Sequence, residues 1–269
     1  MAGMTITVLG CGASGGVPLI GCDCAVCRSE NPKNKRGRAS ILVESAGSRI
    51  LIDTSPDLRQ QALREGISQV DAILYTHAHA DHVHGVDDAR SFNFHRQASL
   101  PVYGTAETMQ EITSRFNYAF GEPAKPGAVW FKPSLEAKEI EEYDLFSVGN
   151  MEIQSFFQHH GKGNSTGYRF GNFAYSTDVD KLGEDSLQLL EKLDVWLVDC
   201  LRYTPSPTHA SLDLTLGWID RLKPKLSILT HMAHEMDYEL LREQLPPNVI
   251  PAYDGMLIHL GADGSLHIA

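Results

Sequence analysis

His77-Ala78-His79-Ala80-Asp81-His82 (HAHADH) follows a short apolar run, Ala72–Tyr75, and largely decides the fold. Imidazole and carboxylate ligands suit Zn²⁺, Mn²⁺ or Fe, and four of them within six residues would repel one another without a cation. On a turn after a strand, the first two histidines can face one side while the Asp-His pair faces the other. This geometry favours two metal ions that share a bridging hydroxide over a solvated polar loop or one structural histidine.

Other predicted strands supply further metal-ligand candidates at their ends. They are His160 after 151–158, Asp178 after 172–176 and His231 after 225–229. Open sheets concentrate functional groups at the carboxyl ends of their strands. One histidine in such a place is more often a satisfied structural residue, but the set around 77–82 indicates a binuclear metal site.

The rest of the pattern predicts strands and helices in two similar halves without a linker. Strands are expected at 5–9, 40–44, 49–53, 72–75, 151–158, 166–170, 172–176, 195–199, 225–229, 256–260 and 265–269. Helices are expected at 58–65, 105–118, 187–193, 211–222 and 239–245, and an irregular loop at 120–134. This order predicts one layered α/β (α+β) domain over 1–269, with the sheets inside and the helices outside.

Composition excludes several classes of protein. The chain has 269 residues, 42% of them apolar and 21% charged, which argues against disorder and coiled coil. Its net charge of −11 disfavours a nucleic-acid partner, and the sequence has no run of eighteen apolar residues that could span a membrane. An odd count of five cysteines is a poor disulfide framework, and the N-terminus lacks the basic region of a signal peptide. We therefore expect a cytoplasmic protein.

Three of the cysteines form a cluster, Cys22-x-Cys24-x-x-Cys27, in a loop at 21–28. Three thiolates so close together indicate a tetrahedral Zn²⁺ with a fourth ligand from elsewhere. By composition the fourth ligand is open among Cys11, Cys200 and His234. The competing interpretation is a loop with three free cysteines.

His209 stands in the loop Pro205–Ser211, just before a predicted helix. It is either an ordinary loop residue or a general acid that reaches the metal centre. A sugar alkoxide leaving group needs an acid more than a lactone or thioester does, so His209 favours chemistry at phosphorus.

These residues together resemble the metallo-β-lactamase superfamily of metal-dependent hydrolases, over nearly the whole chain. The resemblance implies a four-layered αββα sandwich. It also implies one metal ion held by His77, His79 and His160, a second held by Asp81, His82 and His231, and Asp178 as a ligand that bridges them. Asp81 counts among the catalytic residues as well. His159 is the alternative to His160, and Asp53 either orients the loop or only forms a turn.

The cysteine cluster and His209 narrow the resemblance to the phosphoribosyl 1,2-cyclic phosphodiesterases of the carbon–phosphorus lyase pathway. That family implies a structural Zn²⁺ on Cys22, Cys24, Cys27 and His234, with two Mn²⁺ or Zn²⁺ ions at the active site. It further implies His209 as the catalytic histidine, a small cyclic phosphodiester as the substrate, and attack by the bridging hydroxide. A homodimer is compatible with a protein of this size.

Four alternatives stay open at this point. A tRNA 3′-endonuclease would share the ligands but needs a basic arm that this acidic chain does not show. A lactone or thioester hydrolase, a relative of the pyrroloquinoline quinone (PQQ) biosynthesis protein and a non-catalytic metal-binding protein are the others. Five residues beside the site receive no role, namely His84, Asp87, Asp88, Arg90 and His95.

Overall fold

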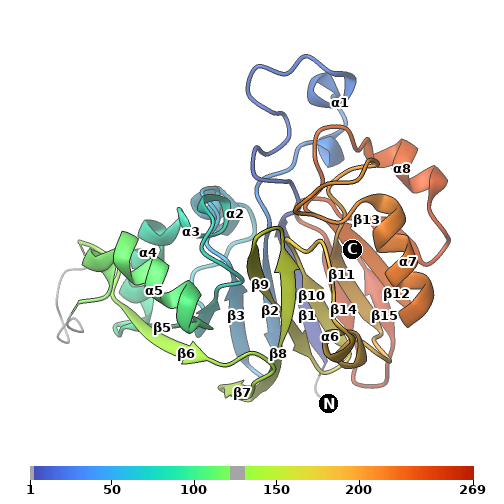
Figure 1. The fold of residues 1–269 in the computed structure, drawn as a ribbon. Coiled ribbons are helices and arrows are strands. Elements are labelled where there is room, and N and C mark those ends of the chain that lie inside the picture. Colours follow the sequence, from blue (N-terminus) through green and yellow to red (C-terminus); the bar gives the residue numbers. More distant parts are fainter. Residues whose placement is uncertain (1–2, 122–130) are drawn as a thin grey trace.

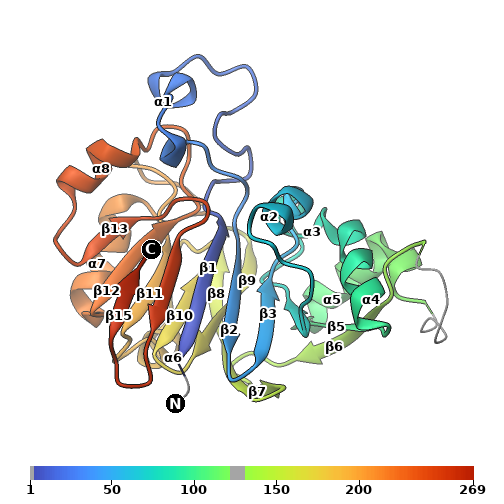
Figure 2. The ribbon, with the colours of Figure 1, turned by 180° about the vertical axis from the view of Figure 1, so that it is seen from behind.

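The protein is described here by a computed structural model over residues 3–121 and 131–269. Two β-sheets pack face to face, and helices cover the outer surface of each (Figure 1). The view from behind shows the same four layers (Figure 2). The expected αββα sandwich in a single domain is confirmed.

The first sheet has eight strands in the order β15-β14-β1-β2-β3-β4-β5-β6. Their bounds are β1 Met4–Gly10, β2 Ser40–Ser45, β3 Ser48–Ile52, β4 Ala72–Leu74, β5 Leu100–Thr105, β6 Leu135–Ile140, β14 Leu257–Leu260 and β15 Leu266–Ile268. Strands β3 to β6 are parallel, whereas the other pairs are antiparallel. The C-terminal hairpin β14–β15 thus extends the sheet that the N-terminal strand begins.

The second sheet has seven strands in the order β13-β12-β11-β10-β9-β8-β7. Their bounds are β7 Leu145–Val148, β8 Met151–His160, β9 Gly163–Phe170, β10 Phe173–Ser176, β11 Val195–Asp199, β12 Leu226–Thr230 and β13 Val249–Pro251. Strands β10 to β13 run parallel to one another. Their carboxyl ends therefore meet at one edge of the sheet.

Helices cover each sheet on its outer face (Figure 1). On the first sheet they are α2 Leu58–Arg64, α3 Ala80–Val83, α4 Arg90–Arg96 and α5 Ala106–Arg115. On the second they are α6 Glu184–Leu189, α7 Leu212–Leu222 and α8 Tyr238–Gln244, while α1 Ala25–Arg28 lies on a loop that stands out from the sandwich. None of the helices in the described ranges is long and apolar enough to cross a bilayer.

Alternation along β3 explains why the sheets lie inside and the helices outside. Ile50 and Ile52 belong to the core between the two sheets, whereas Leu51 belongs to a separate core beneath the helices. Successive side chains of a strand point to opposite faces, so a strand buried on both faces is apolar throughout. The sequence ILI at 50–52, within β3, has this composition.

Most expected elements agree with the structure to within a few residues, but the helix expected at 187–193 begins and ends earlier than predicted. The helix α6 begins at Glu184, after Gly183, and ends at Leu189. Part of the loop expected at 120–134, residues 122–130, lies outside the described residues. The strands β5, β6, β7 and β13 and the helix α4 had no counterpart in the sequence pattern.

Candidate metal centre

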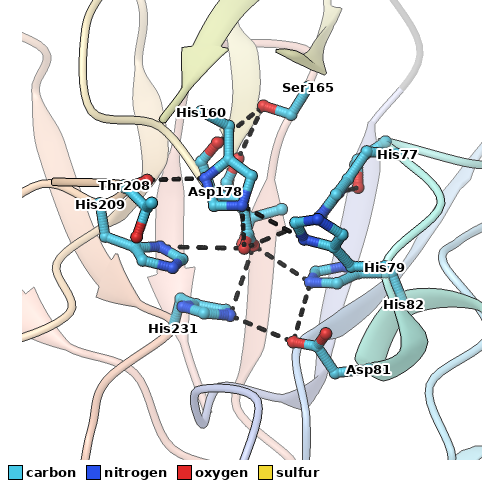
Figure 3. A network of polar contacts seen from close by, with 12 residues as sticks. His77, His79, Asp81, His82, His160, Ser165, Asp178, Thr208, His209 and His231 are labelled. Carbon is cyan, nitrogen blue, oxygen red and sulfur yellow. Dashed lines mark hydrogen bonds and ion pairs between the residues drawn. The ribbon is translucent and has the colours of Figure 1, made fainter. Parts of the chain in front are cut away.

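The histidines and aspartates expected from the sequence converge at the carboxyl ends of strands from both sheets (Figure 3). His77 and His79 lie between β4 and α3, and α3 itself carries Asp81 and His82. His160 is the last residue of β8. Asp178 and His231 follow β10 and β12.

Three non-glycine residues at these strand ends adopt left-handed backbone conformations. Their φ angles are +63° at Asp53, +53° at Asp178 and +56° at His231. Such conformations cost on the order of 1–3 kcal/mol each and persist only where the surroundings impose them. At Asp178 the buried Ser165 hydroxyl donates a 2.8 Å hydrogen bond to the backbone carbonyl. In this conformation Asp178 and His231 contribute to the groups of possible metal ligands, and Asp53 contacts Thr76 and His82.

The side chains form two groups that share Asp178. One group contains His77, His79 and His160, and the other contains Asp81, His82 and His231; within each group the possible ligand atoms lie within 4.8 Å of one another. Asp178 Oδ1 lies 3.6 Å from His160 Nε2 and 3.8 Å from His77 Nε2. Asp178 Oδ2 lies 3.1 Å from His82 Nε2 and 3.3 Å from His231 Nε2. Each carboxylate oxygen therefore faces a different group.

The donor set fits two divalent cations. The Nε2 atoms of His77, His82 and His231 are buried and have no hydrogen-bond partner among the described residues. Buried polar atoms without partners are costly, and a shared cation satisfies several of them at once. Imidazole and carboxylate ligands suit Zn²⁺ and Mn²⁺ alike.

Two histidines in each group have shifted pKa values, and the shifts of the two groups have opposite directions. Burial lowers the pKa of His77 and His160 below its usual range, so both stay neutral. Burial opposes the charged form of His82 and His231 too, but the neighbouring carboxylates together outweigh it, Asp178 and Asp53 at His82 and Asp178, Asp81 and Asp199 at His231. The pKa of His82 is therefore raised well above its ordinary value, and that of His231 is raised to about 9.

Contacts behind the cluster fix how its histidines are oriented. His82 Nδ1 lies 2.7 Å from the buried carboxylate of Asp53, which also accepts hydrogen bonds from the backbone and hydroxyl of Thr76. His160 Nδ1 donates to the carbonyl of Thr208 at 2.6 Å. His159 is not in either group, because alternation along β8 turns its ring against Phe157.

His209 lies beside both groups, with a buried partner that the sequence analysis missed. Its Nδ1 is 3.1 Å from Asp199 Oδ2, and its ring stacks on His231 at 4.8 Å. Asp199 ends β11 and is completely buried. The signal was an acidic residue that closes an otherwise apolar strand, VWLVD at 195–199.

The residues left without a role lie outside these groups. His84 is exposed and packs edge-to-face against Phe116, and His95 is exposed on α4. Asp87 accepts a 2.7 Å hydrogen bond from Tyr118. Neither Asp88 nor Arg90 belongs to a group of possible metal ligands among the described residues.

A second cluster contains Cys22, Cys24, Cys27 and His234, whose ligand atoms lie within 4.8 Å of one another. His234 Nδ1 is 3.4 Å from the sulfur of both Cys22 and Cys24. The hydrogen bond with His234 lowers the pKa of Cys24 to about 6, which favours the thiolate. All five cysteines are free, and Cys11 and Cys200 are buried elsewhere. Of the open candidates for the fourth position, the structure brings His234 to the cysteines.

Comparison with known families agrees with this geometry. Residues 48–232 match the family model described as the beta-lactamase superfamily domain. The chain belongs to this superfamily. A solved structure of a diphosphatase from the PhnP family is 38% identical in sequence and superposes with a TM-score of 0.88, covering 96% of this chain and 97% of that one. Because this relative is 38% identical and is covered over 97% of its length, the chain belongs to the PhnP family as well. Zn²⁺-bound PqqB from Methylobacterium extorquens, 17% identical with a TM-score of 0.76 over 94% of this chain and 99% of its own, shares the fold.

Two curated proteins match this chain over about half of their own length. An octanoyltransferase of Porphyromonas gingivalis is 36% identical over 256 residues, which cover 94% of this chain and 51% of that protein. A ribonuclease Z of Bradyrhizobium diazoefficiens is 33% identical over 133 residues, 46% of this chain and 44% of the enzyme. The chain thus spans about half the length of these relatives. The expectation of a metallo-β-lactamase fold is confirmed.

Proposed function

We propose that the chain is a binuclear metal-dependent phosphodiesterase that hydrolyses a small cyclic phosphodiester such as 5-phosphoribosyl 1,2-cyclic phosphate. The observation that carries this proposal is the His209–Asp199 pair, 3.1 Å apart, next to a cluster suited to two cations. Cleavage of a phosphodiester expels a sugar alkoxide, which needs a proton. The similarity to a PhnP-family diphosphatase supports chemistry at phosphorus.

The ligand assignment follows the two groups of side chains. His77, His79 and His160 would hold one cation, Asp81, His82 and His231 the other, and Asp178 would bridge them. Two Mn²⁺ or Zn²⁺ ions bound there would neutralise phosphate oxygens and lower the pKa of bound water. The chain itself contributes the spacing, because the two oxygens of Asp178 face opposite groups.

His209 would act as the general acid. Its Nδ1–H donates to Asp199, which leaves Nε2 to carry a proton to the departing oxygen. The carboxylate stabilises the imidazolium and fixes the ring. General acid catalysis of this kind contributes typically 10²–10⁴-fold in rate.

The cysteine cluster would hold a structural Zn²⁺. Its three thiols and the imidazole of His234 match the closed tetrahedral donor set of structural zinc sites. Because His234 follows His231 by three residues, this zinc would anchor the chain just beyond one ligand of the metal centre.

Thioester hydrolysis is the second candidate. It is favoured by the 36% identity to part of an octanoyltransferase over 94% of this chain. A thioester expels a thiolate, which leaves without an acid, so this reaction gives His209 no task.

The test is hydrolysis by metal-reconstituted protein and its His209→Ala variant. The substrates are a ribose 1,2-cyclic phosphate, a 2′,3′-cyclic nucleotide, a precursor tRNA and an octanoyl thioester. We expect turnover of the cyclic phosphodiesters and a loss of about 10²-fold or more in the variant. Cleavage of the thioester alone, with the variant unimpaired, would reject the phosphodiesterase. Cleavage of precursor tRNA alone would reject the small substrate.

A further inference from the structure

A cavity of about 750 Å³ opens beside the metal centre on the side of His77, His79 and His160. The turn between β8 and β9 forms one wall of this cavity, and the helix α5 forms another. Its volume is in the range of small-molecule sites. A substrate phosphodiester at the metal centre would extend its remaining groups into it.

The turn contributes a cation, and the first residues of β9 contribute an amide. Lys162 and Asn164 line the cavity, and both are exposed. Over residues 3–121 and 131–269, neither side chain has a hydrogen-bond partner, and Lys162 has no ion-pair partner. Both can therefore donate to a ligand without breaking an existing contact.

The facing wall has the opposite charge. Arg115 lines it, but its guanidinium donates to the Ala78 carbonyl and pairs with Glu111. Glu107 and Glu142 line the same cavity and have no cationic partner in the part of the chain that the structure describes. Among the described residues that line the cavity, Lys162 is the cation without a carboxylate partner. An anionic group of a ligand would therefore bind at the turn that carries Lys162.

The backbone that carries Lys162 is fixed relative to His160. Gly161 between them has a φ of +62°, and its N–H donates to Asp180 Oδ1 at 2.9 Å. A Cβ atom at Gly161 would lie 2.6 Å from the Thr208 side chain, so the turn packs tightly against the loop before His209. The backbone thus holds Lys162 at a defined place in the turn beside the metal centre.

We propose that Lys162, assisted by Asn164, is a specificity-determining residue that binds a second anionic group of the substrate, a phosphate monoester. This inference rests on the proposed phosphodiesterase activity. The scissile phosphodiester occupies the metal centre, the monoester contacts the turn, and the carboxylates of Glu107 and Glu142 face the hydroxyl-bearing part. Hydrogen bonds to charged groups of this kind change affinity by about tenfold or more.

The experiment compares kcat/KM for 5-phosphoribosyl 1,2-cyclic phosphate with kcat/KM for ribose 1,2-cyclic phosphate, which lacks the monoester. The ratio of the two values is the readout. We expect the wild-type ratio to exceed about 10, the ratio of Lys162→Ala to fall about tenfold, and that of Lys162→Glu to fall further. The matched control is Lys181→Ala, an exposed lysine outside the cavity lining, which should keep the wild-type ratio.

The outcomes separate this inference from the proposed function. If the wild type hydrolyses both substrates but the ratio is unchanged in Lys162→Ala, Lys162 does not bind the second phosphate. The proposed phosphodiesterase activity is then still supported. If the wild type hydrolyses no phosphodiester, the proposed function fails first. Circular dichroism and metal content of the variants show whether a changed ratio comes from recognition or from misfolding.

Discussion

At the scale of single residues, the site depends on which nitrogen of each histidine is already committed. Nδ1 of His82 faces Asp53, Nδ1 of His160 faces the Thr208 carbonyl, and Nδ1 of His209 faces Asp199. In each case Nε2 is left for the site. A hydrogen bond to one ring nitrogen fixes the tautomer and the ring orientation, which makes the other nitrogen a better ligand or proton carrier.

Asp199→Asn tests this arrangement at His209. The amide oxygen can still accept from His209 and from the Val179 N–H, 3.0 Å away, but the negative charge that stabilises the imidazolium is gone. We expect about a tenfold or greater loss of kcat on substrates with alkoxide leaving groups. The loss should be much smaller on a nitrophenyl phosphodiester, whose leaving group needs no proton. An equal loss on both kinds of substrate, with normal metal content, would mean that Asp199 only supports the fold.

At the scale of elements, strands that carry a continuous apolar run, such as β3 and β11, were predicted from the sequence, whereas β5 and β6 were missed. β11 is buried throughout, β3 is buried except at Arg49, and both were found. β5 contains Pro101 and Gly104, which usually interrupt strands, and half of the residues of β6 are exposed, in the charged sequence LEAKEI. Their pairing with β4 and with each other stabilises them, and no local pattern carries that information.

The same contrast holds for the site. The ligand candidates could be read from the sequence because histidine and aspartate at strand ends are conspicuous. Asp199 could not, because its role depends on a loop that returns ten residues later with His209. Lys162 was missed as well, since an exposed lysine gains meaning only from the cavity that it lines.

The loop at 21–28 that carries the three cysteines leads to a prediction about metal content and thermal stability. If zinc holds Cys22, Cys24, Cys27 and His234 together, wild-type protein should contain three metal ions per chain, and Cys24→Ser should contain two. Because the donors come from segments far apart in the chain, loss of this ion should also lower the melting temperature. Elemental analysis and thermal denaturation measure both effects. A stoichiometry unchanged by the substitution would mean that the thiols bind no metal, and Cys200→Ser, at a buried cysteine outside the cluster, is the matched control.

At the scale of the whole molecule, the metal centre joins the two halves of the sandwich. One half supplies His77, His79, Asp81 and His82, and the other supplies His160, Asp178 and His231. A cation bound to both halves stabilises only the folded state, in which they face each other. Removal of the ions should therefore destabilise the entire domain.

The pH dependence of that stabilisation is predictable in sign. Without a cation the pKa of His231 is raised from 6.5 to about 9, so its proton stabilises the fold fully below pH 6.5 and this contribution is lost as the pH rises toward 9. A cation displaces the proton, so its binding strengthens over the same interval. We expect the rise in melting temperature on adding Mn²⁺ to increase between pH 6.5 and 9. A rise independent of pH, or one retained in Asp178→Asn, would contradict this assignment.

The order of the ligands along the chain has a consequence for biosynthesis. HAHADH and the three cysteines leave the ribosome before His231 and His234, which lie far along the sequence from them. Neither cluster can be completed on a nascent chain that ends before these two histidines. Strand β14 must still return to pair with β1 after they have been synthesised. A cation that needs all the donors of either cluster would therefore bind only after His231 and His234 have been synthesised, and a chain truncated before residue 231 would leave both clusters incomplete.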